Sequence, residues 1–142
     1  MTRPEYNLQV ASMMLIDALG LPAFHVPNER RCTPAQGARL KAQGVKAGVP
    51  DIIICRAHHW TDDPALRHGV AIELKAPGNY PTDAQHDWLR RFAEEGWTAR
   101  VCKSIPEVVA VLDDAGLLLH PQTGKRLDPT YAAMGLLREA RA

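Results

Sequence analysis

The sequence predicts a single α/β domain in which helices flank a mixed central sheet. Two observations support this prediction. Helical and strand-forming patterns alternate along the chain in the order α-β-α-β-β-α-β-α. The length of 142 residues, with 46% hydrophobic and 23% charged residues, suits one hydrophobic core and is too short for two ordinary domains.

The first fifty residues contain two predicted helices and one predicted strand. Thr2 is followed by a proline and then by Glu5, which is the pattern of a capped helix start with an early carboxylate. An apolar stripe continues from there to Gly20, a typical helix end. Residues 24–26 are expected to form a short strand, and residues 33–44 a second helix that begins at Thr-Pro and ends at Gly.

Two strands and a helix are predicted in the middle of the chain. Residues 51–55 are dominated by isoleucine, which is typical of a buried central strand. The segment 56–68 contains an Asp-Asp-Pro sequence and is expected to be a loop. Residues 69–75 are the next expected strand, and a helix follows from the capping residue Thr82 to Gly96.

The rest of the chain continues the same alternation. Residues 97–102 are expected to form a strand, and Ser-Ile-Pro-Glu at 104–107 opens a helix that ends near Gly116. Residues 117–128 have the pattern of a short hairpin, and a terminal helix is expected to start at Pro129. The chain contains no repeats and no linker, so these last elements are expected to pack on the same domain.

A cluster of charged residues is predicted where two strands pair. Side chains alternate between the two faces of a strand, so Glu73 and Lys75 share one face. Asp51 begins the preceding strand, and pairing of the two strands would bring it close to Glu73. Two converging carboxylates suit a hard divalent cation such as Mg²⁺ or Mn²⁺, and a neighbouring lysine can orient an attacking water or stabilise charge on a phosphate. An ion pair on an exposed sheet face is the alternative interpretation of Glu73 and Lys75.

One polar residue interrupts the apolar face of the helix at 82–96. Gln85, Trp88, Leu89 and Phe92 share that face at helical spacing, and only Gln85 is polar. A glutamine at the head of a core-facing stripe needs a hydrogen-bond partner. Gln85 is therefore expected to reach the charged cluster or a nucleic-acid phosphate. A bond to nearby backbone is the alternative.

The segment from residue 30 to residue 50 is basic, although the formal net charge of the whole chain is only +1. It holds five basic residues and no acidic one. A local basic surface attracts phosphate while the whole molecule stays near neutral. An ordinary solvated helix face explains the pattern equally well. The five residues are Arg30, Arg31, Arg39, Lys41 and Lys46.

Composition disfavours several classes of protein. The three cysteines are odd in number, widely spaced and without a CxxC pair, so neither a zinc ribbon nor a disulfide framework is indicated. No apolar run is long enough to span a bilayer, and the N-terminus lacks the features of a signal peptide. A cytoplasmic location without a membrane partner is expected.

Taken in order, four motifs resemble those of the VRR-NUC family, which belongs to the PD-(D/E)XK nuclease superfamily. The resemblance covers roughly residues 3 to 115 and implies the restriction-endonuclease-like core of that superfamily. The expected division is a VRR-NUC domain at 1–116 and a C-terminal hairpin and helix extension at 117–142. The motifs lie at 25–30, 40–51, 72–75 and Gln85.

The resemblance also implies individual roles. Glu5 occupies the place of a further acidic residue in the family's first helix, and it is equally well explained as a capping residue. Asn28 matches a family motif and joins the five basic residues as an expected DNA contact. The expected catalytic residues are Asp51, Glu73, Lys75 and Gln85. The expected metal ligands are Glu5, Asp51, Glu73 and the carbonyl oxygen of Leu74.

The function implied by the resemblance is hydrolysis of DNA phosphodiester bonds by a Mg²⁺- or Mn²⁺-dependent endonuclease. Stand-alone bacterial and phage relatives suggest a homodimer that acts on branched DNA such as Holliday junctions, in repair or recombination. Two sites related by a twofold axis suit such paired cuts. The cytoplasm would be that of a bacterium, or of the host if a phage encodes the chain. Two alternatives stay open: an endonuclease or nickase on duplex or flap DNA, and a nucleic-acid-binding protein that does not cleave.

Overall fold

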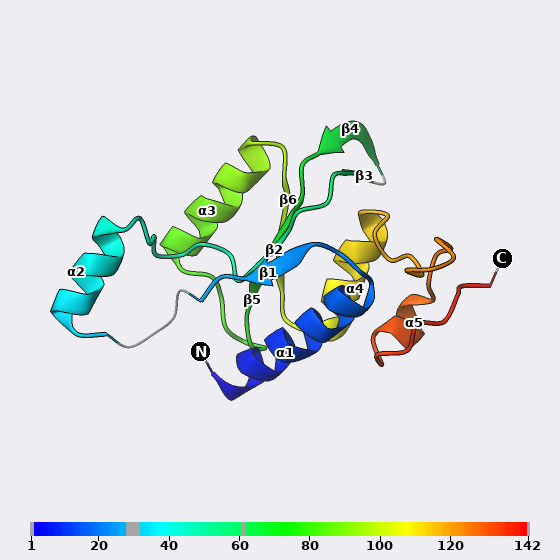
Figure 1. Cartoon of the computed structure of the whole chain (residues 1–142), viewed down its shortest axis with the longest axis horizontal. Helices are drawn as coiled ribbons and strands as arrows, with labels where there is room; N and C mark the ends of the chain where they lie inside the picture. Colours follow the sequence, from blue (N-terminus) through cyan, green and yellow to red (C-terminus); the bar gives the residue numbers. More distant parts are fainter. Residues whose placement is uncertain (1, 28–31, 61, 142) are drawn as a thin grey trace.

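A four-stranded mixed sheet forms the centre of the molecule (Figure 1). The computed structural model describes residues 2–27, 32–60 and 62–141. The strands of this sheet are β1 (Ala23–His25), β2 (Ile52–Ile54), β5 (Val70–Leu74) and β6 (Thr98–Cys102). They lie in the order β1-β2-β5-β6, where β2 is antiparallel to both β1 and β5, and β6 is parallel to β5. The predicted α/β fold with a mixed sheet is confirmed.

Helices cover both faces of the sheet, as predicted (Figure 1). The helices are α1 (Arg3–Ala18), α2 (Pro34–Ala42), α3 (Asp83–Glu94), α4 (Ile105–Asp114) and α5 (Pro129–Ala132). α1 and α4 contact each other and the sheet, whereas α3 packs on β5 and β6 from the other side. Within the described part of the chain, no helix combines the length and the apolar character that crossing a membrane requires.

All residues of strand β5 are buried. One face of the strand belongs to the core, and the other carries part of the charged cluster. Val70, Ile72 and Leu74 belong to the hydrophobic core that includes residues of α1 and α4. Each such side chain contributes about 1.5–3 kcal/mol when it is fully buried. Glu73 lies on the opposite face, beneath the start of α3. Cys102 pairs with Leu74 in the sheet, and burial raises the pKa of its thiol to about 12, so this thiol stays protonated and serves packing.

The segment 56–68, which was predicted to be a loop, instead contains a two-stranded antiparallel sheet. Strand β3 (His58–Trp60) pairs with β4 (Asp63–Arg67), with a register shift between His59 and Trp60. The Asp-Asp-Pro sequence suggested a loop, but its proline, Pro64, lies near the beginning of β4. A proline there, in a sheet of only two strands, need not break a ladder of hydrogen bonds on both sides.

The C-terminal extension contains less helix than the sequence predicts. α5 has only 4 residues, and Gly135 with a φ of 80° ends the helical segment soon after it. Leu127 and Ala132 are almost fully buried within the main core. The extension therefore shares the core of the rest of the chain. A domain boundary at residue 116 stays a prediction.

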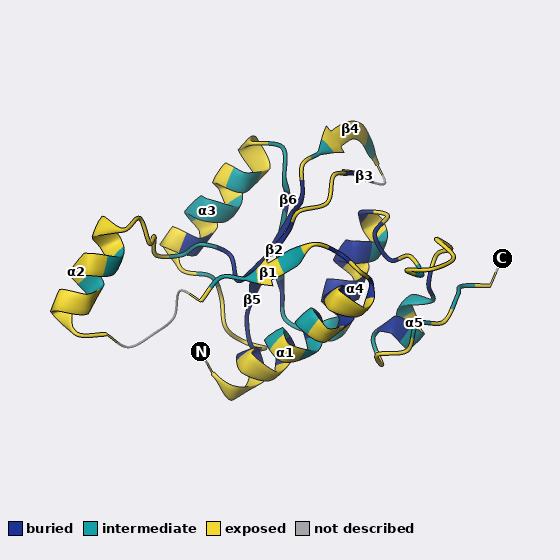
Figure 2. Ribbon diagram, viewed as in Figure 1, coloured by how far each residue is buried: buried dark blue, intermediate teal, exposed yellow. Residues whose placement is uncertain are grey.

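Helix α2 projects from the body of the molecule, and none of its residues is buried (Figure 2). Its start is stabilised by a capping box, in which the Thr33 hydroxyl accepts from the Gln36 backbone and the Gln36 side chain accepts from the Thr33 backbone. Isolated helices of this length are marginal in water, so the cap matters to α2 more than it does to a packed helix.

Candidate active site

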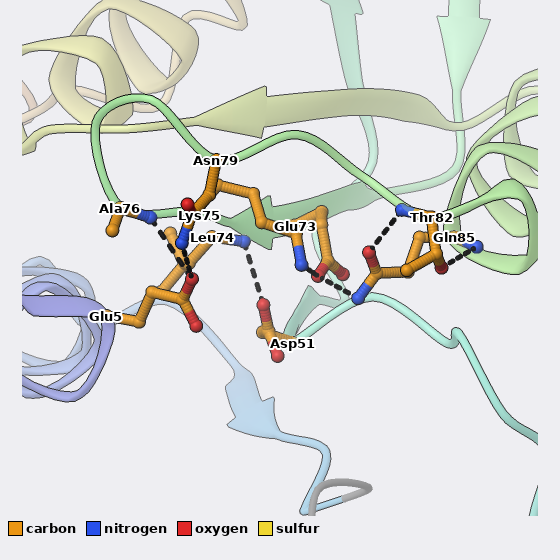
Figure 3. Close-up of polar contacts among 9 residues, drawn as sticks. All are labelled: Glu5, Asp51, Glu73, Leu74, Lys75, Ala76, Asn79, Thr82 and Gln85. Atoms are coloured by element: carbon orange, nitrogen blue, oxygen red, sulfur yellow. Dashed lines mark hydrogen bonds and ion pairs between the residues drawn. The ribbon is translucent and has the colours of Figure 1, made fainter. Parts of the chain in front are cut away.

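Three carboxylates and one lysine gather where α1, β2 and β5 meet (Figure 3). Glu5 lies in the first turn of α1, and Asp51 directly precedes β2. Glu73 and Lys75 come from β5 and the residue after it. Relative exposure is 5% for Glu5, 2% for Asp51, 1% for Glu73 and 8% for Lys75. Burial rules out the alternative of an ion pair on an exposed sheet face.

Asp51 is held by the register of the two strands. Ile52 pairs with Ile72 in the antiparallel ladder, so Asp51 and Glu73 are the next residues along. The Asp51 carboxylate accepts a hydrogen bond of 2.8 Å from the backbone N–H of Leu74. Its carbonyl oxygen accepts from the backbone N–H of Val26, also at 2.8 Å. The side chain therefore has a fixed direction along the end of the sheet.

Glu73 is joined to both Lys75 and Gln85. Its Oε1 lies 3.7 Å from the Lys75 Nζ and accepts a 2.8 Å hydrogen bond from the Gln85 side-chain amide. The Gln85 Oε1 accepts in turn from the backbone N–H of Thr82, and the Thr82 hydroxyl accepts from the Gln85 backbone. Gln85 thus makes the expected contact with the cluster and also the alternative bond to nearby backbone, because one side-chain amide reaches Glu73 and caps α3.

Glu5 lies at the start of α1, but its carboxylate bonds to the segment after β5 and not to the Thr2 backbone, so its role as a metal ligand stays a prediction. Its backbone N–H donates to the hydroxyl of Thr2, which caps α1. Its carboxylate turns toward the cluster, where Oε1 accepts from the backbone N–H of Ala76 at 3.2 Å and from the Asn79 amide at 3.4 Å. Asn79 was not predicted as a site residue. Its only signal in the sequence was a Pro-Gly-Asn turn after the strand.

The expected DNA contacts lie apart from the carboxylates. Arg39 and Lys41 are exposed on α2, and Lys46 is exposed on the segment after it. In the described ranges, no hydrogen bond or ion pair connects these three side chains to the cluster. They are nevertheless on the stretch of chain that leads into Asp51. Asn28, Arg30 and Arg31 fall outside the described residues.

The donor set of the cluster fits a hard divalent cation. Three buried carboxylates and one ammonium group gather there, in a place with little access to water. All the available donors are oxygens, which Mg²⁺ and Mn²⁺ prefer. One turn along α1 from Glu5, the buried Oε1 of Gln9 makes no hydrogen bond within the described residues.

The cluster is not a preassembled set of three metal ligands. In the part of the chain that the structure describes, no three His, Cys, Asp or Glu side chains are arranged around one point. Each of the three carboxylates accepts at least one N–H instead. Mg²⁺ commonly binds proteins through only one or two carboxylates and keeps several waters, so a full set is not required.

Comparisons with known proteins identify the family of the chain. The family model described as "VRR-NUC domain" matches residues 4–106, a range that includes the whole carboxylate cluster. A solved structure described as "VRR_NUC domain protein" is similar to the chain, with a TM-score of 0.62 and 29% sequence identity, over 81% of this chain and 89% of that one. A search among curated proteins found no match. The chain therefore belongs to the VRR-NUC domain family, a nuclease-type family of which a solved member shares its fold.

Proposed function

We propose that the protein is a Mg²⁺- or Mn²⁺-dependent endonuclease that hydrolyses phosphodiester bonds in branched DNA such as Holliday junctions. The observation that carries this proposal is the buried cluster of Asp51, Glu73 and Lys75 at the paired ends of β2 and β5. A protein that only bound DNA would gain nothing from burying these charges, which cost stability.

Asp51 and Glu73 would hold the ion, with the carbonyl oxygen of Leu74 as a further ligand. Glu5 would contribute through a water molecule, because its carboxylate is already bonded to Ala76 and Asn79 at the edge of the cluster. Once bound, the ion supplies Lewis-acid stabilisation of the negative charge on the phosphate oxygens.

Lys75 supplies the positive charge of the site. Its ammonium group is buried and lies beside Glu73, where it would position the attacking water or stabilise the charge that develops on the phosphate. Asp51 and Glu73 have little freedom to move, because the Leu74 backbone and the Gln85 amide hold them. Such preorganisation lowers the cost of reaching the reactive geometry. Gln85 acts through Glu73 and is a positioning residue.

The basic residues would bind the DNA backbone. Arg39, Lys41 and Lys46 are exposed and have no carboxylate partner within the described ranges, so they can contact phosphates without reading bases. We further propose a homodimer, because two active sites related by a twofold axis suit the paired cuts that resolve a four-way junction. Such a reaction belongs to DNA repair or recombination.

Cleavage of a panel of labelled substrates tests this function. A four-way junction, a flap and a linear duplex are incubated with the protein in Mg²⁺, in Mn²⁺ and in EDTA. We expect metal-dependent cutting that is fastest on the junction and is lost in Lys75→Ala. Equal cutting of duplex or flap would favour the broader endonuclease or nickase. Binding without cutting of any substrate, or undiminished cutting by Lys75→Ala, would contradict the proposal.

The role of Gln85 can be separated from helix capping. Gln85→Ala removes a hydrogen bond to Glu73 and also a cap of α3, whereas Gln36→Ala removes the same kind of cap from α2 and touches no carboxylate. We expect Gln85→Ala to slow cleavage by about 10- to 100-fold, the usual effect of removing a partner of a metal ligand. Single-turnover rates at several Mg²⁺ concentrations measure this loss. Equal rates in the two variants would show that only the cap matters.

A further inference from the structure

An exposed tyrosine directly follows Asn79, the residue whose amide contacts the carboxylate cluster. Tyr80 has a relative exposure of 75%, the highest among the large hydrophobic residues that the structure describes. The Nζ of Lys103 lies 4.0 Å from the centre of its ring, a cation–π contact. An exposed aromatic ring costs free energy in water, so this ring is not explained by packing.

Tyr80 directly follows a residue that touches the active site. The amide of Asn79 donates to the Glu5 carboxylate (Figure 3), and the backbone N–H of Asn79 donates to the carbonyl of Ala76 at 3.0 Å. This turn lies between Lys75 and the start of α3, which are both parts of the proposed catalytic machinery. The ring is therefore within one residue of the groups that hold the cluster.

Both members of the pair lie on a restrained backbone. Prolines at 77 and 81 limit the conformations of the segment that carries Tyr80. Lys103 joins β6 to α4, and its backbone N–H donates to the Glu107 carboxylate. An aromatic ring that is held in place before binding loses little entropy when a ligand stacks on it.

We propose that Tyr80 and Lys103 bind one unpaired nucleobase of the DNA next to the scissile phosphate. The base would stack on the tyrosine ring, and the ammonium group would stay close to the adjoining phosphate. Bases inside a duplex have no free face, so only an unpaired base can use the ring. The preferred substrate is then branched DNA whose base pairs at the cut site open when the protein binds, such as those at the branch point of a four-way junction. This inference rests on the proposed nuclease function and deepens it.

Binding and fluorescence measurements test the proposal without cleavage. Affinity is measured in EDTA and in Ca²⁺ for two oligonucleotides, a branched one with unpaired bases at the branch and a fully paired duplex. A 2-aminopurine at the unpaired position reports stacking through its quenching. The variants are Tyr80→Ala and Tyr80→Phe. Tyr131→Ala is the matched control, because Tyr131 makes the same kind of contact with Arg138, at 4.4 Å, on α5 far from the cluster.

We expect Tyr80→Ala to weaken binding of the branched DNA by about 5- to 100-fold and to abolish the quenching, with less than about a twofold change on the duplex. Tyr80→Phe and Tyr131→Ala should both behave like the wild type. Equal losses on the two DNAs, or no loss in Tyr80→Ala, would overturn the proposal. A change in the sedimentation of the free protein without a change in DNA binding would assign the ring to a protein contact and would also overturn it.

These results are independent of the nuclease test. If Tyr80→Ala binds like the wild type while Lys75→Ala still abolishes cleavage, the stacking proposal fails and the nuclease proposal stands. If the wild type cuts no substrate and Tyr80→Ala nevertheless loses affinity for unpaired bases, the nuclease proposal fails and the stacking site stands. A wild type that binds neither oligonucleotide overturns both.

Discussion

Asp51→Asn is expected to slow DNA cleavage by about 10²- to 10³-fold, the effect typical of removing one electrostatic group from an active site. Asparagine has nearly the shape of aspartate. It keeps an oxygen that can accept from the Leu74 backbone N–H, as the Asp51 carboxylate does at 2.8 Å in the wild type. The substitution therefore removes the charge and preserves the local hydrogen bond. Single-turnover cleavage of the branched substrate in Mg²⁺ measures the effect.

The control for this substitution is Asp17→Asn. Asp17 is exposed near the end of α1, so the same chemical change there should leave the cleavage rate unaltered. DNA affinity is measured in parallel, because a loss of binding would also slow the reaction at low protein concentration. An Asp51→Asn variant that cleaves as fast as the wild type would remove Asp51 from the mechanism.

Gly48→Ala is expected to lower the free energy of unfolding by about 2–4 kcal/mol, because it combines backbone strain with a steric clash. Gly48 has a φ of +84°, which side-chain-bearing residues rarely adopt, and an added Cβ would lie 2.7 Å from the backbone carbon of Ala84 in α3. The segment before Asp51 thus packs directly on the helix that carries Gln85. Urea denaturation measures the loss of stability. Cleavage should fall as well, because both Asp51 and Gln85 would shift.

Gly78→Ala separates the two causes of this loss. Gly78 has nearly the same φ, +85°, but an added Cβ there meets no atom within 4 Å. We expect it to lose only the strain contribution, about 1–2 kcal/mol. The difference between the two variants is the cost of the contact between Gly48 and α3. Equal losses would mean that this contact does not position the segment.

The sequence could predict the site because three of its residues lie on two adjacent strands. Alternation along β5 places Glu73 and Lys75 on one face, and Asp51 follows from antiparallel pairing with β2. Gln85 was detectable because it is the polar member of an apolar stripe on α3. In each case a local pattern was sufficient, because the geometry of a strand or a helix fixes the direction of the side chain.

Other features depend on pairs of residues that are distant in the sequence. The contact between Glu5 and Asn79 joins the first turn of α1 to a turn after β5, and no local pattern indicates it. Lys103 meets Tyr80 only because β6 is parallel to β5, so that its end lies beside the same edge of the sheet. The sheet of β3 and β4 was missed because its Asp-Pro sequence is also typical of loops.

Thermal unfolding in EDTA and in Mg²⁺ tests most directly whether the buried carboxylates form a cation site. We predict that Mg²⁺ raises the melting temperature of the wild type, by an amount equivalent to about 2.7 kcal/mol at 100 times Kd. Mg²⁺ should no longer stabilise Asp51→Asn, because this variant lacks one of the two carboxylates proposed to hold the ion. A wild type that melts at the same temperature with and without Mg²⁺ or Mn²⁺, or an Asp51→Asn variant that gains as much from Mg²⁺ as the wild type, would contradict the account.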